Sequence, residues 1–374
     1  MRRIFGARRR GRRVAAAAVG IVIFAGVLGV RGAQQGYYRL ARVPTLGTLH
    51  GRLLTDADVL GLPLSIGTDG RRLAVIDGAG EPALHFFRAE DGAFLGSLGR
   101  RGDGPCEFRS AISLDGHAGG EGFWVYDLSL ARLTHVIREE GSGGWRCDGS
   151  LRLDADAVLT GPVWLPRGPI VSLGFQSGGR LAYFDPEGRL LRAVGAIPGL
   201  DEDGPANVRQ HAYRGELKLK PDGTRLAVGL RHAGEIEIYT PDGRLLARRS
   251  GPSEFPPVYA VHSTDHGPTM TTGPRLRFGY VDLGVTDRFI VGLFSGYARG
   301  QRPGEAYFGH QIHLFDWDGR YLGAWELDTS LISMTVDART GRMYGVRHDP
   351  VPGILVFQLP APPEAAPGPA GVRG

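Results

Sequence analysis

Two histidines and an aspartate lie close together at His262, Asp265 and His266. Imidazole nitrogens and a carboxylate are ligands that zinc takes in proteins. The spacing predicts a site for a divalent metal, and with it an envelope hydrolase or lyase that would need a further ligand such as His211 or His310. The alternative is that these are ordinary loop side chains, because eleven histidines in 374 residues produce such pairs by chance.

A second group of residues suits the recognition of an anion. Arginine offers paired donors to carboxylate, sulfate or phosphate groups. The predicted ligand-binding residues are Arg109, Arg209, His211, Arg231, Arg299 and Arg302. The alternative is that arginine is simply this chain's default cation. Of its 44 lysine and arginine residues, only Lys218 and Lys220 are lysine.

Motifs of nucleophilic or phosphate chemistry are absent from the sequence. It contains no Gly-x-Ser-x-Gly elbow, no phosphate-binding loop and no His-Glu-x-x-His pair. Glu107 and Glu254 stand in two copies of a Gly-Pro-x-Glu-Phe segment. A residue repeated in equivalent places is expected to be structural, accepting hydrogen bonds from the backbone N–H groups of a linker. Phe108 and Phe255 are expected to fill the space between adjacent repeats.

Short apolar segments with period-two alternation, separated by turns, must position these residues. Asp-Gly or Glu-Gly turns at Gly92, Gly188, Gly243 and Gly319 each follow one strand pattern and precede another. Such turns between alternating segments favour β-hairpins. Similar turns at Gly70, Gly223 and Gly341 lie earlier in each unit. Each unit therefore reads as a four-stranded meander.

Six such units predict an all-β, six-bladed β-propeller, since a blade of about 40–50 residues must pack against others to bury its faces. The expected blades span residues 62–103, 110–153, 163–197, 213–250, 276–328 and 330–359. The last unit shows three convincing strands. Residues 45–54 are expected to supply its fourth strand and close the ring, which leaves no exposed edge.

This arrangement predicts two different ends of the propeller. The linkers between blades and the loops after each second strand share the face that surrounds the channel mouth. Basic residues outnumber acidic ones there, which predicts an electropositive mouth and an anionic partner. Beside the six residues given above, the basic residues expected there are Arg132, Arg180, His232, Arg347 and His348. The loop at residues 294–311 is the expected place for specificity.

The N-terminal segment predicts export. Seven arginines fall within the first thirteen residues, and residues 14–30 carry no charge. This is the pattern of a signal anchor or of a cleaved signal peptide, and both alternatives stay open. Without those arginines, 37 basic residues face 39 acidic ones, so the net charge of +5 gives no reason to expect nucleic-acid binding. Outside the cytoplasm Cys106 and Cys147 either form a disulfide or remain separate thiols.

The chain resembles the six-bladed propellers of the NHL and TolB-like kind. Residues 99–108 match the family's glycine-rich linker, and residues 123–127 (Phe-Trp-Val-Tyr-Asp) match its second strand. Asp77 and Asp127 correspond to the family's aspartate, whereas the asparagine expected in the next loop is missing. The resemblance covers most of residues 60–359. It implies the fold and not one function, because the fold carries binders, scaffolds and several enzyme classes.

The sequence as a whole predicts a non-catalytic module of the cell envelope that binds a protein, a peptide or an anionic glycan. Residues 1–33 are the signal segment, 34–44 a linker, 45–359 the propeller and 360–374 a disordered tail rich in Pro, Ala and Gly. The N-terminal segment would hold the module on the membrane, or release it if cleaved. A divalent metal is the cofactor that the alternative, enzymatic hypothesis requires.

Overall fold

The structure, a computed structural model, describes residues 43–116, 122–155, 157–166, 168–176 and 178–359. All of them belong to one compact unit, Tyr38–Gly374. The expected signal segment and the C-terminal tail lie outside the described residues. Among the helices of the described part, none is long and apolar enough to cross a membrane.

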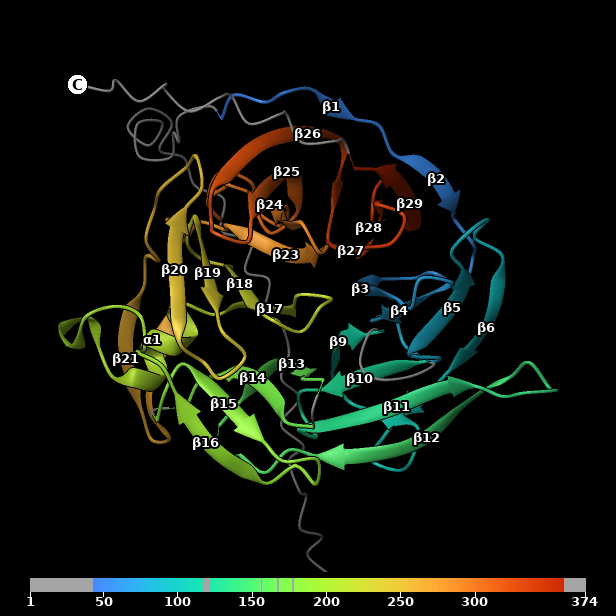
Figure 1. The fold of residues 1–374 in the computed structure, drawn as a ribbon, viewed down its shortest axis with the longest axis horizontal. Coiled ribbons are helices and arrows are strands. Elements are labelled where there is room, and N and C mark those ends of the chain that lie inside the picture. The colour runs from blue at the N-terminus through green and yellow to red at the C-terminus, as the bar shows by residue number, and fades with distance from the viewer. Residues whose placement is uncertain (1–42, 117–121, 156, 167, 177, 360–374) are drawn as a thin grey trace, which may run out of the picture. The chain divides into compact units, whose positions relative to one another are not determined.

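Six four-stranded antiparallel blades surround a central axis (Figure 1). The predicted all-β, six-bladed propeller is confirmed.

Blades one to four each come from one continuous stretch of chain. Blade one is β3 (Pro63–Thr68), β4 (Arg72–Asp77), β5 (Leu84–Arg88) and β6 (Phe94–Leu98). Blade two is β9 (Ala111–Asp115), β10 (Phe123–Asp127), β11 (Arg132–Arg138) and β12 (Trp145–Arg152). Blade three is β13 (Leu159–Trp164), β14 (Ile170–Gly174), β15 (Leu181–Phe184) and β16 (Leu190–Val194). Blade four is β17 (Gly215–Leu219), β18 (Leu226–Leu230), β19 (Glu235–Tyr239) and β20 (Leu245–Ser250).

The N-terminal residues complete the last two blades. Blade six is β27 (Ser333–Asp337), β28 (Arg342–Arg347), β29 (Gly353–Gln358) and, outermost, β2 (Arg52–Thr55). β2 pairs antiparallel with β29, with Leu53 opposite Leu355. Blade five is β23 (Tyr280–Val285), β24 (Phe289–Phe294), β25 (Gly309–Asp316) and β26 (Tyr321–Leu331), to whose edge β1 (Thr48–Leu49) adds in parallel. The N-terminal segment thus closes the ring as predicted, but its first part extends blade five.

The first strand of each blade lines the axis. These strands pack against one another around it in the order β3, β9, β13, β17, β23 and β27. All six run in the same sense, so the turns after them lie at one end of the propeller, here named the turn face. The linkers between blades and the loops after each second strand lie at the other end, the linker face.

Hydrophobic clusters fill the space between neighbouring blades. One cluster joins Phe86 of blade one to Val125 of blade two, around the buried Phe108 of the linker. Another joins Ile236 of blade four to Phe294 of blade five, around the buried Phe255. The expectation that both phenylalanines pack between blades is confirmed. Burial of these side chains stabilises the ring by the hydrophobic effect, at roughly 1.5–3 kcal/mol for each large side chain.

Carboxylates hold the loops and turns that the sequence repeats. Asp127 is fully buried and accepts backbone N–H bonds from Arg109, Ser110 and Leu130 at 2.6, 3.0 and 3.0 Å. Glu107 accepts the backbone N–H of Gly104 at 2.8 Å, and this bond, followed by the Arg100 side chain, lowers the pKa of Glu107. These residues are structural, as the repetition of Glu107 predicted. In the turns, Gly188 and Gly319 have φ of 86° and 84°, which glycine adopts without a Cβ clash.

Three further features lie in the linkers. The first linker carries the short parallel pair β7 (Arg100–Arg101) and β8 (Glu107–Phe108). Cys106 in it forms a disulfide with Cys147 of β12, with Cα atoms 5.7 Å apart, which settles the alternative that the sequence left open.

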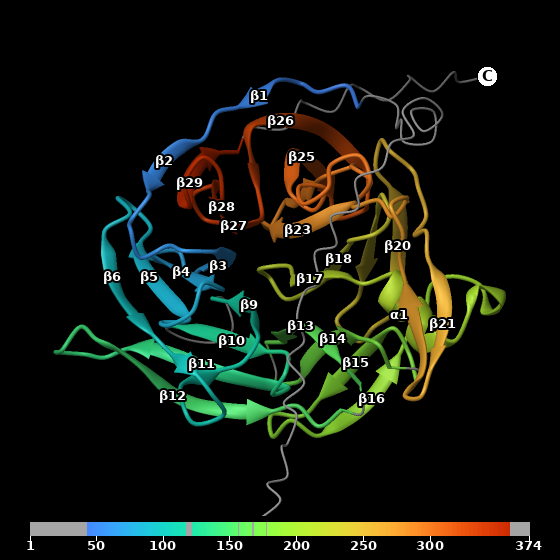
Figure 2. The same ribbon diagram turned by 180° about the vertical axis from the view of Figure 1, so that it is seen from behind.

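The linker before blade four forms η1 (Asp201–Asp203) and α1 (Ala206–Ala212), a helix that sequence reasoning did not predict. The linker before blade five forms the hairpin β21 (Ala260–Thr264) and β22 (Gly267–Thr271), and β22 contacts α1. Figure 2 shows β21 of this hairpin beside α1.

Candidate functional site

Strand β17 carries charge along the wall of the channel. Arg214 precedes it, Glu216 and Lys218 lie within it, and Lys220 follows it. Alternate residues of a strand point to the same side. Leu217, which lies between them, is buried in the cluster that joins blades three and four. This wall of the channel therefore presents positive, negative, positive and positive charges in turn, from the linker face to the turn face.

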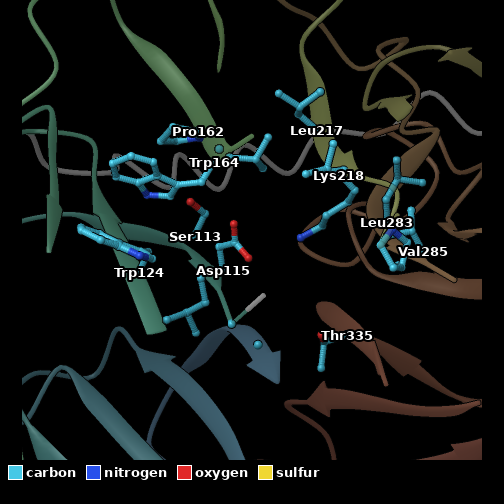
Figure 3. Close-up of a pocket in the computed structure, with 18 of the residues that line it drawn as sticks. Ser113, Asp115, Trp124, Pro162, Trp164, Leu217, Lys218, Leu283, Val285 and Thr335 are labelled. Carbon is cyan, nitrogen blue, oxygen red and sulfur yellow. The ribbon is translucent and has the colours of Figure 1, made fainter. Parts of the chain in front are cut away.

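A cavity of about 750 Å³ occupies the turn-face end of the channel. We call it the axial cavity (Figure 3). All six first strands contribute to its wall. They provide, among others, Thr68, Asp115, Trp164, Lys218, Val285 and Thr335. A volume of this size suits a small organic molecule, which protein sites usually hold in pockets of roughly 300–1,000 Å³.

One side of the axial cavity is aromatic. The rings of Trp124 and Trp164 meet at a tilt of 44° with their centroids 5.1 Å apart. His135 stacks on Trp124 at 4.7 Å and also lines the cavity. Flat faces of this kind accept planar ligands by stacking.

The charged side chains of the axial cavity differ in their partners. Lys220 pairs with Asp222, and its ammonium lies 5.8 Å from the centroid of the Trp317 ring. Glu216 accepts a hydrogen bond from Arg231 at 2.5 Å. Lys218 is half-buried, points into the cavity, and makes no hydrogen bond or ion pair with any described residue.

A buried carboxyl group lies close to Lys218. Asp282 accepts hydrogen bonds from Ser333 Oγ at 2.6 Å and from the backbone N–H of Met334 at 2.9 Å. Burial raises the pKa of Asp282, and the charge of Lys218 opposes that rise. The positive charge of Lys218 therefore favours the ionised form of Asp282.

Basic side chains gather toward the linker-face end of the channel. We call this group the basic cluster, and it consists of His211, Arg214, Arg231, His232 and Arg299. Burial, followed by the charge of Arg231 and more weakly by that of Arg299, lowers the pKa of Arg214 to about 10, while Glu216 opposes the shift. The Nε atom of Arg214 is buried and has no hydrogen-bond partner among the described residues.

The two histidines of the basic cluster are held neutral near pH 7. Burial, and then the charge of Arg214, lowers the pKa of His211 to about 4. His211 stacks on Phe175 with ring centroids 4.3 Å apart. Burial, followed by Arg214 and Arg231, lowers the pKa of His232 well below its ordinary value. Each of these shifts arises first from burial and then from the positive charge of neighbouring arginines.

The structure brings together three of the six predicted ligand-binding residues, His211, Arg231 and Arg299. Within this group Arg231 bonds to Glu216, and Arg299 donates to Thr272 Oγ1 at 3.0 Å. The other three lie outside the basic cluster and bond to local partners. Arg109 pairs with Asp103. Arg209 donates to Gly199 O at 3.0 Å and to Asp201 at 2.6 Å. The Nη1 atom of Arg302 lies 3.8 Å from Oε2 of Glu305, and its Cζ atom lies 4.3 Å from the centroid of the Tyr297 ring.

Arg180 and the predicted metal ligands also need to be placed in the structure. Arg180 was expected at the channel mouth, but it is fully buried between blades three and four and pairs with Glu237. His262, Asp265 and His266 are exposed on the hairpin β21–β22. Across the described residues, no group of three or more His, Cys, Asp or Glu side chains is placed to hold a metal ion.

Sequence reasoning missed the axial cavity, none of whose lining residues was predicted. A signal was nevertheless present. The segment Arg-Gly-Glu-Leu-Lys-Leu-Lys at residues 214–220 alternates charged side chains with glycine or leucine, and it holds both lysines of the chain. Charge on one side of a strand and apolar residues on the other is the pattern expected of a strand that borders a polar channel.

The chain is thus a six-bladed β-propeller whose channel holds the axial cavity at one end and the basic cluster at the other. Residues 51–339 match the family model described as TolB-like 6-blade propeller-like. The chain therefore belongs to this family.

No curated protein matches the sequence. Among solved structures the chain is similar to "Structure of U3-55K", at 10% identity and a TM-score of 0.48, covering 83% of this chain and 98% of that one. It is also similar to "Crystal structure of RRP9 WD40 repeats", at 9% identity and a TM-score of 0.48, covering 83% and 97%. Another similar chain is Raptor of Chaetomium thermophilum, at 10% identity and a TM-score of 0.46, covering 80% of this chain and 28% of that one.

Proposed function

We propose that this propeller is a non-catalytic binding module of the cell envelope whose basic cluster holds an acidic segment of a partner protein. The observation that carries the proposal is the side chain of Arg214. It forms no ion pair with a described residue, and its Nε atom has no hydrogen-bond partner there; Glu216 is the nearby anion, while Arg231 and Arg299 add positive charge. A partner carboxylate would supply charge-assisted hydrogen bonds there.

The linkers around the basic cluster favour a protein as the source of the carboxylate. Leu200, Val258 and Val261 are exposed apolar side chains on the linkers before blades four and five. Apolar side chains beside arginines are typical of protein interfaces. The position outside the cytoplasm rests on the N-terminal arginines and the uncharged residues 14–30 that follow them.

A labelled acidic peptide tests this proposal. Fluorescein-labelled hexaglutamate, titrated at low salt and followed by anisotropy, is expected to bind the propeller, and its affinity should fall as salt is added. Arg299→Ser removes an exposed arginine of the cluster and is expected to weaken binding about tenfold. Arg214→Met tests the buried centre of the cluster and is expected to weaken binding at least as much.

Arg302→Ser is the matched control for Arg299→Ser. It removes an exposed arginine three positions away that already lies beside Glu305 and Tyr297, so binding should change less than twofold. The proposal fails if hexaglutamate does not bind, or if Arg299→Ser and Arg302→Ser weaken binding equally. Binding of heparin in place of hexaglutamate would reject a protein partner in favour of an anionic glycan.

A further inference from the structure

The axial cavity is a second site, distinct from the basic cluster. It opens toward the turn face, whereas the basic cluster lies toward the linker face. Glu216, which lines the cavity and bonds to Arg231, stands between them along β17. Neither the proposed function nor the family gives the cavity a ligand.

The choice of lysine at position 218 is informative. Arginine is the usual cation of this chain, and the only two lysines, Lys218 and Lys220, both line the axial cavity. An ammonium is a compact point charge, whereas a guanidinium is a broad planar fork. Lysine at position 218 therefore places a compact positive charge in the wall of the axial cavity.

Only one of the two lysines is available to a ligand. Lys220 is already paired with Asp222. Lys218 points into the cavity and has no hydrogen bond or ion pair with the described residues (Figure 3). A half-buried cation gains most from an anion that enters the same low-dielectric space, because charges interact more strongly there than in water.

The rest of the wall suits an apolar, planar body. Trp124 and Trp164 form one side, and Leu283 and Val285 lie on the far side of the same space (Figure 3). Asp115 also faces this space. Because Lys220 is already paired, Lys218 is the lysine of this wall that can pair with a ligand, which favours a single negative charge on that ligand.

We propose that the axial cavity binds a small organic monocarboxylate, with its planar body against Trp124 and Trp164 and its carboxylate paired with Lys218. The aromatic wall contributes stacking and apolar burial, and the ammonium contributes one charge-assisted hydrogen bond. A single available ammonium at Lys218 favours a ligand with a single negative charge. The axial cavity lies at the other end of the channel from the basic cluster, so its ligand does not depend on the proposed function.

Three matched compounds test the ligand class. Isothermal titration calorimetry with 2-naphthoate, 2-naphthamide and 2,6-naphthalenedicarboxylate keeps the aromatic body constant and changes the charge. The wild-type propeller is expected to bind 2-naphthoate at least tenfold more tightly than the amide, and more tightly than the dicarboxylate. The proposal is overturned if 2-naphthoate does not bind at millimolar concentration, or if acid and amide bind equally.

Variants at the two lysines test the residue. Lys218→Met keeps most of the side-chain length and is expected to weaken 2-naphthoate at least tenfold while leaving 2-naphthamide unchanged. Lys220→Met removes a lysine that is already paired, so it should change either affinity less than threefold. Trp164→Leu should weaken both compounds. Unchanged affinity for 2-naphthoate in Lys218→Met would overturn the proposal.

Two controls keep this test independent of folding and of the other site. Lys218→Arg keeps the charge at position 218, so it should retain more of the acid-over-amide preference than Lys218→Met if the latter proves unstable. Equal loss of that preference in both variants would count against the charge as its source. Hexaglutamate binding should be unchanged in Lys218→Met, and 2-naphthoate binding should be unchanged in Arg299→Ser.

Discussion

Arg180 and Glu237 form an ion pair between blades three and four in which neither side chain is exposed to solvent, with Nη2 and Oε2 2.9 Å apart. Arg180 also donates to Gln210 at 3.0 Å, and Tyr239 donates to Glu237 at 2.9 Å. Burial alone would raise the pKa of Glu237, but Arg180 and then Arg248 hold it below its ordinary value. The pair thus locks two neighbouring blades with most of its hydrogen bonds satisfied.

Removing one charge of this pair should destabilise the propeller strongly. Glu237→Gln leaves Arg180 buried without its full counter-charge, which costs about 3–5 kcal/mol in the free energy of unfolding. Denaturant unfolding measures the loss. Glu187→Gln is the control, since it breaks a largely exposed pair with Arg189 and should cost less than about 1 kcal/mol. A similar, small effect of both variants would show that the buried pair does not lock the blades.

The disulfide should stabilise the linker between blades one and two. The bond between Cys106 and Cys147 joins residues 41 positions apart. Constraining a loop of that length in the unfolded chain contributes about 4 kcal/mol by the chain-entropy model. The double variant Cys106→Ser/Cys147→Ser should therefore unfold at lower denaturant concentration than the oxidised wild type. Dithiothreitol should lower the midpoint of the wild type and leave that of the double variant unchanged.

Packing of the outer strand of blade six should depend on Leu54 and not on its neighbour Leu53. Leu54 is 8% exposed and packs with Tyr344 and Ile354, whereas Leu53 is 40% exposed. Leu54→Ala should cost about 2–4 kcal/mol because it leaves a cavity under the outer strand of blade six. Leu53→Ala should cost less than about 1 kcal/mol. Thermal unfolding of the two variants compares them directly, and equal losses would contradict the packing described for β2.

His211 should make stability depend on pH. Its pKa falls from 6.5 in the unfolded chain to about 4 in the folded protein. Below about pH 6.5 the unfolded chain therefore binds a proton that the folded chain does not, so stability falls as the pH drops toward 4. Urea midpoints at pH 7.5, 6.0 and 5.0 should decline less steeply in His211→Asn than in the wild type. His50→Asn, at a largely exposed histidine, should follow the wild-type slope.

Most of the fold could be predicted because each blade repeats its own local signals. The turns at Gly188 and Gly319 and the alternating strands beside them are short-range features that a sequence displays openly. The N-terminal strand was harder to place. Residues 48–49 and 52–55 lie in one short segment of the sequence, yet they pair with different blades, because their register is set by partners about three hundred positions away.

The candidate sites were less predictable for a related reason. Side chains on the first strands meet only across the axis, so no short segment shows that Trp124, Lys218 and Thr335 share one cavity. Arginines misled in the opposite way. In the sequence Arg209 and Arg180 resemble Arg231, but Arg209 bonds to Asp201 of its own linker and Arg180 to Glu237 of the next blade, whereas Arg231 bonds to Glu216 on the channel wall. Only the scarcity of lysine in the chain pointed to the channel.

Because Leu53 pairs with Leu355, blade six joins the N-terminal strand β2 to the last strand of the propeller, β29. A nascent chain released before β29 is made would leave both β2 and β28 without the strand that pairs with them. An unpaired strand edge is a template for aggregation or proteolysis. The ring can therefore close through β2 only after β29, the last strand of the propeller, has been synthesised.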